Sequence, residues 1–213
     1  MFVRRSLIAL AVAFTFVACE DTTGPVNDHG AVPGPQLSRM PSPAMHIVRQ
    51  SPSAPPLEAY RVSFWAFVGQ ASTVRVRYLA AAGESLGHPF LRFEIPKQGL
   101  ETSADGRRLK RGDSVHITLT IDPGSFDVHF KPSGVSFSKI WPAALTLWYG
   151  NADPDLDGDG EVDATDQTLA QHLAVWSQTR KTQPWLRLAS NNNANRKFVA
   201  ARLYHFSEYA VCW

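Results

Sequence analysis

Acidic side chains are concentrated in one short stretch of the chain, between residues 153 and 166. Seven of the 19 Asp and Glu residues lie there. Calcium takes six to eight oxygen ligands at about 2.3–2.6 Å, so its carboxylate ligands must converge from a tightly curled loop. Without a metal ion, such closely spaced carboxylates would repel one another strongly. We therefore predict a twelve-residue Ca²⁺-binding loop from Asp155 to Asp166.

The spacing assigns a role to each ligand position of this loop. Carboxylate oxygens are expected at positions 1, 3 and 5, a sharp turn at Gly160, a backbone carbonyl at position 7, a direct or water-mediated contact at position 9 and a closing carboxylate at position 12. These ligand positions are filled by Asp155, Asp157, Asp159, Glu161, Asp163 and Asp166. Val162, which is apolar, is expected to pin the loop to the core.

A second interpretation treats the same residues as a solvated acidic turn that caps a helix. Asp163 is suited to the N-cap and Asp166 to the first helical turn, where carboxylates are favourable. The two interpretations are compatible with each other. Leu169, Leu173 and Trp176 recur at helical spacing, which predicts a helix face that packs on the rest of the domain.

The loop has EF-hand-type spacing and resembles that of dockerin modules, which also end in Asp and lack an ordinary entering helix. Dockerins carry two such repeats, whereas this chain contains one. Ala164-Thr165 stand where dockerins carry their recognition pair, so a cohesin-binding role is disfavoured. The shorter Asp side chain at position 12 indicates modest affinity and a structural role in extracellular calcium.

Most of the chain after Ala59 predicts short β-strands rather than helices. Apolar residues alternate with polar ones, and turn sequences such as Asp122-Pro123-Gly124 separate the runs. The expected strands are 63–68, 74–78, 90–95, 115–121, 126–130, 145–149, 185–188, 198–204 and 209–213. This pattern predicts a mainly β fold, an antiparallel immunoglobulin-like β-sandwich over 59–213, with the calcium loop and a short α-helix inserted at about 151–182.

Sequence motifs in the C-terminal half carry a further resemblance. Phe130-Lys131-Pro132-Ser133-Gly134, Leu145-Thr146-Leu147-Trp148-Tyr149, Trp185 and Val199 to Val211 follow one another in order, and Phe93-Glu94-Ile95-Pro96 precedes them. This order resembles ZU-five-like β-sandwich domains of bacterial envelope proteins over about residues 88–213. The resemblance implies an immunoglobulin-like sandwich used in adhesion or scaffolding, and it implies no substrate.

Some ZU-five-type domains cleave themselves at a His-Phe-Ser motif, and this chain contains His205-Phe206-Ser207. The resemblance would make His205 the base and Ser207 the nucleophile that attacks the Phe206 carbonyl. The alternative is that the motif only packs. Because many bacterial relatives keep the motif only for packing, the resemblance implies a non-enzymatic protein, and self-cleavage between Phe206 and Ser207 is the alternative.

The N-terminus predicts an export signal. Arg4 and Arg5 precede the apolar run from Leu7 to Ala18, which is too short to span a bilayer and matches a signal peptide over 1–18. Phe16-Val17-Ala18-Cys19 resembles a bacterial lipobox, although Phe16 stands where Leu is usual. This resemblance implies a lipidated Cys19 that anchors the protein in the cell envelope, at the outer membrane or cell surface. The alternatives are an ordinary secretory signal and a Cys19–Cys212 disulfide.

Residues 19–58 form the predicted tether. The segment from Glu20 to Glu58 holds eight Pro and no aromatic residue, so it lacks the apolar groups needed to offset the entropy of ordering. The net charge also differs between the predicted parts of the chain. The formal net charge of +2 becomes zero from Cys19 onward and would be +7 without the acidic loop.

The remaining signals concern partners. A near-neutral total charge argues against nucleic-acid binding. The basic body could favour an anionic envelope polymer or lipid headgroups, although a solvated sheet face is the default interpretation. Trp65, Trp148 and Trp213 could bind a carbohydrate or a protein ligand. Arg111-Gly112-Asp113 is expected to be a hairpin turn. His116 and His129 could form a zinc pair, although solvent-exposed strand histidines are the default.

Overall fold

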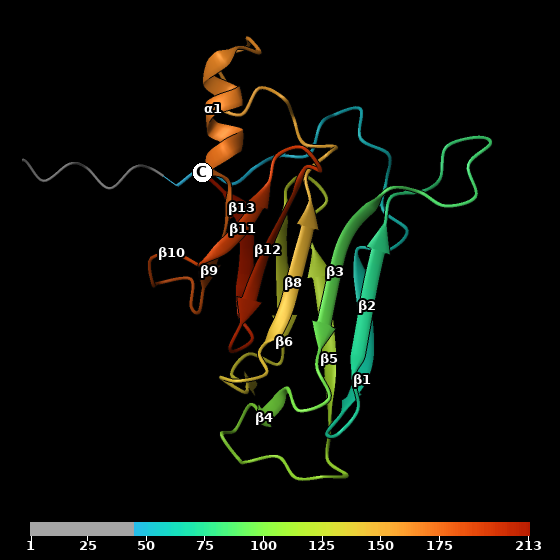
Figure 1. Cartoon of the computed structure of the whole chain (residues 1–213), viewed down its shortest axis with the longest axis vertical. Coiled ribbons are helices and arrows are strands. Elements are labelled where there is room, and N and C mark those ends of the chain that lie inside the picture. The colour runs from blue at the N-terminus through green and yellow to red at the C-terminus, as the bar shows by residue number, and fades with distance from the viewer. Residues whose placement is uncertain (1–44) are drawn as a thin grey trace, which may run out of the picture. The chain divides into compact units, whose positions relative to one another are not determined.

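The computed structural model describes residues 45–213, and these residues form two packed antiparallel β-sheets (Figure 1). The predicted signal peptide, Cys19 and most of the predicted tether lie outside the described residues. The mainly β fold is confirmed.

A six-stranded sheet has the order β1-β5-β6-β13-β9-β10. Its strands are β1 (Arg61–Phe67), β5 (Ser114–Ile121), β6 (Asp127–Lys131), β13 (Glu208–Cys212), β9 (Ala174–Gln178) and β10 (Leu186–Arg187). The facing sheet has five strands in the order β11-β12-β8-β3-β2. These are β11 (Ser190–Asn193), β12 (Phe198–Leu203), β8 (Ala143–Trp148), β3 (Pro89–Ile95) and β2 (Ser72–Arg77). A short pair, β4 (Leu100–Thr102) and β7 (Ser136–Phe137), completes the strands.

The space between the sheets is filled by the apolar residues of each alternating pattern. In β5, Val115, Ile117, Leu119 and Ile121 are buried, while His116 and Thr120 are exposed. Aromatic rings form the centre: Phe130 stacks on Phe206 with ring centroids 5.0 Å apart, and Phe93 lies 4.6 Å from Phe130. Period-two alternation therefore placed the core correctly because each strand is buried on one side only.

The ordered domain begins before Ala59, so the predicted boundary of the tether is wrong at its C-terminal end. Val48 and Leu57 are 2% and 4% exposed, and residues 47–50 form bridges with Cys212, Ser125 and Ala152. The Val48 amide donates to the Val211 carbonyl at 2.9 Å, and the Phe126 amide donates to the Val48 carbonyl at 3.0 Å. The segment is ordered because strand-like backbone pairing compensates for its lack of aromatic residues.

The helix is shorter than predicted. α1 spans Ala164–His172, and Leu173 is its C-cap. Trp176 belongs to β9, which pairs with β13 in the six-stranded sheet, so it does not lie on the helix face. The insertion after β8 therefore ends at β9 and not near residue 182. Figure 1 shows α1 beyond one end of the strands.

Candidate metal centre

The acidic loop begins where β8 leaves the five-stranded sheet. Beyond β8, the Asp153 amide donates to the Arg49 carbonyl at 3.0 Å, and the Ser51 amide donates to the Asn151 carbonyl at 2.9 Å. The N-terminal segment therefore fixes the start of the loop. Leu156 packs against the core, whereas Val162 is 65% exposed. The expectation that Val162 pins the loop is wrong, because the loop turns this side chain outward and anchors through Leu156.

Three predicted ligands converge. Carboxylate oxygens of Asp155, Asp157 and Asp159 lie within 4.8 Å of one another, which is close enough for all three to contact one metal ion. The spacing of two residues between successive carboxylates produces this convergence because the intervening backbone turns sharply. Gly158 and Gly160 have φ of +79° and +94°, which a residue with a side chain rarely adopts.

The backbone of the loop winds around the first carboxylate. Asp155 Oδ1 accepts a hydrogen bond from the Gly158 amide at 2.7 Å, and Oδ2 accepts one from the Gly160 amide at 2.9 Å. Asp159 Oδ1 accepts a hydrogen bond from the Glu161 amide at 2.8 Å. These bonds hold the carboxylates in a curled loop, which is the arrangement a calcium site requires.

Asp166 closes the loop from the first turn of α1. Its Oδ1 accepts from the amides of Leu156 at 2.6 Å and Asp157 at 3.4 Å, and its Oδ2 accepts from the Asp163 amide at 2.9 Å. Asp166 is 4% exposed, and these backbone bonds, led by that from Asp163, lower the pKa of its carboxyl. The carboxylate is therefore held ionised beside the loop.

Asp163 acts as the helix N-cap, as the second interpretation predicts. Its Oδ1 accepts from the Thr165 amide at 2.6 Å, and together with Asp166 it forms a capping box. Glu161 is exposed. The predicted set is thus divided between a converged group, Asp155, Asp157 and Asp159, and a pair, Asp163 and Asp166, that joins the loop to the helix.

The electrostatics of the converged group favour a cation. Desolvation raises the pKa of the Asp157 carboxyl, and the negative charges of Asp159, Asp166 and Asp155 raise it further. A bound cation would reverse this repulsion. Oxygen ligands with no His or Cys among them suit a hard ion such as Ca²⁺.

Tertiary structure adds groups that the sequence spacing did not single out. A hollow of about 570 Å³ beside the loop is lined by Arg49, Asp122 and Asp153 together with Asp155 and Asp157. Asp153 could have been suspected from the acidic count alone. Arg49 and Asp122 could not, because the pairing of residues 47–50 with distant segments brings them there.

The His205-Phe206-Ser207 motif forms a packed turn between β12 and β13. Phe206 is buried in the aromatic centre, and Ser207 is 2% exposed with its hydroxyl donating to the Glu208 carbonyl at 3.2 Å. The His205 Nδ1 lies 3.5 Å from the Phe206 carbonyl oxygen. Among the described residues, no hydrogen bond joins the His205 ring to the Ser207 hydroxyl.

The other sequence signals are distributed over the sandwich. Arg111-Gly112-Asp113 lies in the turn before β5, and Gly112 has φ of +96°. His116 lies opposite Trp65 and His129 opposite Thr120, so the two histidines are separated by four residues along β5 and do not form a pair. Trp213 stacks on His46 with ring centroids 4.4 Å apart.

No family model, curated protein or solved structure matches the chain. The helix among residues 45–213 is too short and too polar to cross a membrane.

Proposed function

We propose that this chain is a non-enzymatic lipoprotein of the bacterial cell envelope, in which calcium stabilises a β-sandwich that serves adhesion, scaffolding or ligand binding. The observation that carries the proposal is the convergence of the Asp155, Asp157 and Asp159 carboxylates within 4.8 Å. Bound Ca²⁺ would neutralise the loop and link it to the capped start of α1. The ion thus has a structural role.

The proposed envelope location is supported by the sequence around Cys19, the Pro-rich segment that follows it, and the resemblance to ZU-five-like domains. Lipidation of Cys19 would anchor the chain, and an immunoglobulin-like sandwich would present its surface to a partner. Several acyl chains on one residue provide durable membrane attachment, whereas one chain is marginal.

Calcium titration by calorimetry tests the metal site. We expect the full chain, solubilised in detergent and stripped with chelator, to bind Ca²⁺ at one site and Mg²⁺ far more weakly. The double variant Asp155→Asn/Asp159→Asn should lose this binding. Glu58→Gln/Glu84→Gln, which removes two exposed acids outside the loop, is the matched control. Equal binding by both double variants would reject the site.

Metabolic labelling with a radioactive fatty acid tests the anchor separately. The wild-type chain should carry the label and sediment with membranes, and Cys19→Ser should lose both properties. An unlabelled wild-type chain would reject lipidation without affecting the calcium site.

A further inference from the structure

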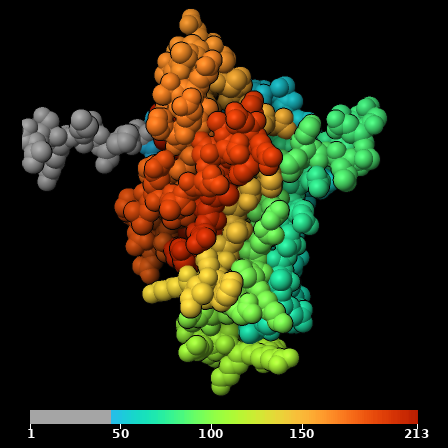
Figure 2. Space-filling model, in the orientation of Figure 1, coloured from blue at the N-terminus to red at the C-terminus, as the bar shows by residue number. Residues whose placement is uncertain are grey.

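The outer face of the five-stranded sheet is open to solvent and unusually basic. Strand register sets which side chains point outward. The outward residues include Arg75 and Arg77 of β2, Arg92 and Glu94 of β3, Ala144, Thr146 and Trp148 of β8, and Ala200 and Arg202 of β12. Figure 2 shows these strands reaching the surface with no other segment across them. We call this surface the basic face.

Positive charge on the basic face is only partly compensated. Four arginines lie on its strands, and Glu94 is the acid among them, 2.5 Å from the Arg92 guanidinium. Arg75 lies directly opposite Arg92 across the β2–β3 pair. Like charges at directly opposite positions destabilise a sheet. Among residues 45–213 no salt bridge engages Arg75, so its charge is available to an anionic ligand.

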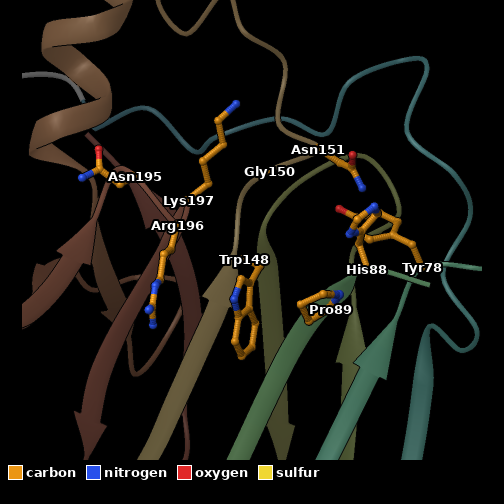
Figure 3. A pocket seen from close by; sticks show the side chains of 9 residues that line it. All are labelled: Tyr78, His88, Pro89, Trp148, Gly150, Asn151, Asn195, Arg196 and Lys197. Atoms are coloured by element: carbon orange, nitrogen blue, oxygen red, sulfur yellow. The ribbon is translucent and has the colours of Figure 1, made fainter. Parts of the chain in front are cut away.

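An aromatic surface lies at one end of the same face. Trp148 is half-buried, and its ring lies 6.1 Å from that of Phe198. It lines a hollow of about 300 Å³ together with His88, Asn151 and Arg196, and a second hollow of about 220 Å³ with Arg75 and Arg92. Figure 3 shows the indole between Arg196 and Pro89. An indole ring with guanidinium groups around it suits a sugar ring that carries a carboxylate.

Small side chains line a further, separate hollow on the same face. Ala144 and Ala200 line a hollow of about 610 Å³ bordered by Asn191 and Arg202. Thr146 separates this region from Arg92, which lies opposite it. From β12 to β2 there are three strand spacings, about 14 Å in all. The hollows are thus spread across the sheet, which suits an extended chain of several sugar rings and not a single small molecule.

We propose that the basic face binds an acidic polysaccharide whose sugar rings carry carboxylate groups. Trp148 would stack on one ring, the arginines would pair with carboxylates, and Asn191 would hydrogen-bond hydroxyl groups. A membrane surface fits less well because Trp148 and Phe198 are half-buried within the sheet and do not project as insertion anchors. This inference names the ligand for the binding role proposed above, but it is independent of the calcium site.

The opposite sheet provides a matched control. On its outer face, Arg61 of β1 and Lys131 of β6 are exposed cations. Their partners on β5, Thr120 and Thr118, are two residues apart. Arg61→Ala/Lys131→Ala removes the same charge as Arg75→Ala/Arg202→Ala but leaves the basic face intact. Arg61 and Lys131 thus serve only to control for net charge.

Calorimetric titration of the full chain in detergent with short oligosaccharides of hyaluronan and of galacturonate tests the proposal. We expect binding to at least one of them that weakens with salt, and no binding to neutral dextran oligosaccharides. Trp148→Ala and Arg75→Ala/Arg202→Ala should each weaken binding by about tenfold. Trp148→Phe should retain part of it, and the control double variant should change it less than about twofold. Thermal unfolding of each variant verifies that it is folded.

Any of three results with the oligosaccharides would overturn the proposal. They are binding to neither acidic oligosaccharide, an equal loss in the control double variant, and full binding by a folded Trp148→Ala. Vesicles containing phosphatidylglycerol and a single-stranded DNA oligonucleotide serve as competing polyanions. Tighter binding to either of these, unaffected by Trp148→Ala, would replace the polysaccharide with a general anionic partner. Because none of these results depends on the acidic loop, they leave the calcium proposal to its own test.

Discussion

The Asp166 carboxylate accepts a hydrogen bond from the Leu156 amide at 2.6 Å, and this bond joins the first turn of α1 to the start of the acidic loop. The same side chain completes the capping box with Asp163. One buried carboxylate thus holds both the helix and the loop, so loop and helix should lose structure together.

Asp166→Ala should therefore destabilise the protein even without calcium. Loss of a cap costs about 1 kcal/mol, and the unpaired amides of Leu156 and Asp157 add to that, so we expect about 2 kcal/mol in all. Urea unfolding in chelator measures this change. Glu84→Gln, which removes an exposed acid, is the control. An equal loss of unfolding free energy in Asp166→Ala and in this control would show that Asp166 does not hold the loop.

The stability of the sandwich should fall as pH rises from about 4 to about 7 because of Asp127. Desolvation and the neighbouring charge of Glu208 raise the pKa of Asp127 to about 7, and its Oδ1 is buried without a hydrogen-bond partner among the described residues. A carboxyl whose pKa is raised on folding binds more protons in the folded state than in the unfolded state. Its stabilising contribution to the free energy of unfolding is therefore complete below the unfolded pKa and is lost as the pH rises through the folded pKa.

Asp127→Asn should remove this dependence and stabilise the protein at pH 8. Because Asp127 is partly exposed to solvent, we expect a gain of about 1–2 kcal/mol at pH 8 and little change at pH 4. Thermal unfolding of wild type and variant across this range, in excess calcium, measures the difference. Parallel curves for the two proteins would contradict the assignment to Asp127.

The Cys212 thiol should be unreactive in the folded protein. The side chain is fully buried, and burial raises the pKa of the thiol, so little thiolate forms. In a Cys19→Ser background, a thiol reagent should label Cys212 only as the domain unfolds, and calcium should slow the labelling. Rapid labelling of folded protein would show that the pairing of Ile47 and Val48 with the end of β13 opens readily.

The mature chain should remain intact at the His205-Phe206-Ser207 turn. The Ser207 hydroxyl donates to the Glu208 carbonyl, and among residues 45–213 no hydrogen bond joins it to the His205 ring, so the nucleophile is not paired with its base. Intact-mass measurement should find one species that extends to Trp213. A fragment that begins at Ser207 would instead support the self-cleaving alternative.

Local sequence pattern predicted the strands that bury one face, and it predicted the Asp163 cap. It missed β11, because a Ser-Asn-Asn-Asn run has low strand propensity and is held by its pairing with β12. It assigned Trp176 to a helix because Leu169, Leu173 and Trp176 also fit helical spacing. Tertiary pairing of β9 with β13 decides between the two patterns.

The candidate site was predictable to the extent that it is local. Two-residue spacing of Asp155, Asp157 and Asp159 predicted their convergence without any tertiary information. The packing of Leu156 in place of Val162, and the approach of Arg49, depend on contacts with residues far away in the sequence. The basic face could not be predicted from the sequence either, because its arginines lie on three strands that only the order of the strands in the sheet brings together.

Thermal unfolding with and without calcium tests the central claim most directly. For a site near saturation, with calcium at about a hundred times Kd, the ion should add about 2.7 kcal/mol, which corresponds to roughly 5–10 °C in Tm for a domain of this size. Asp155→Ala/Asp159→Ala should abolish this shift, and Glu58→Gln/Glu84→Gln should preserve it. An unchanged Tm for wild type in calcium and in chelator would contradict the account.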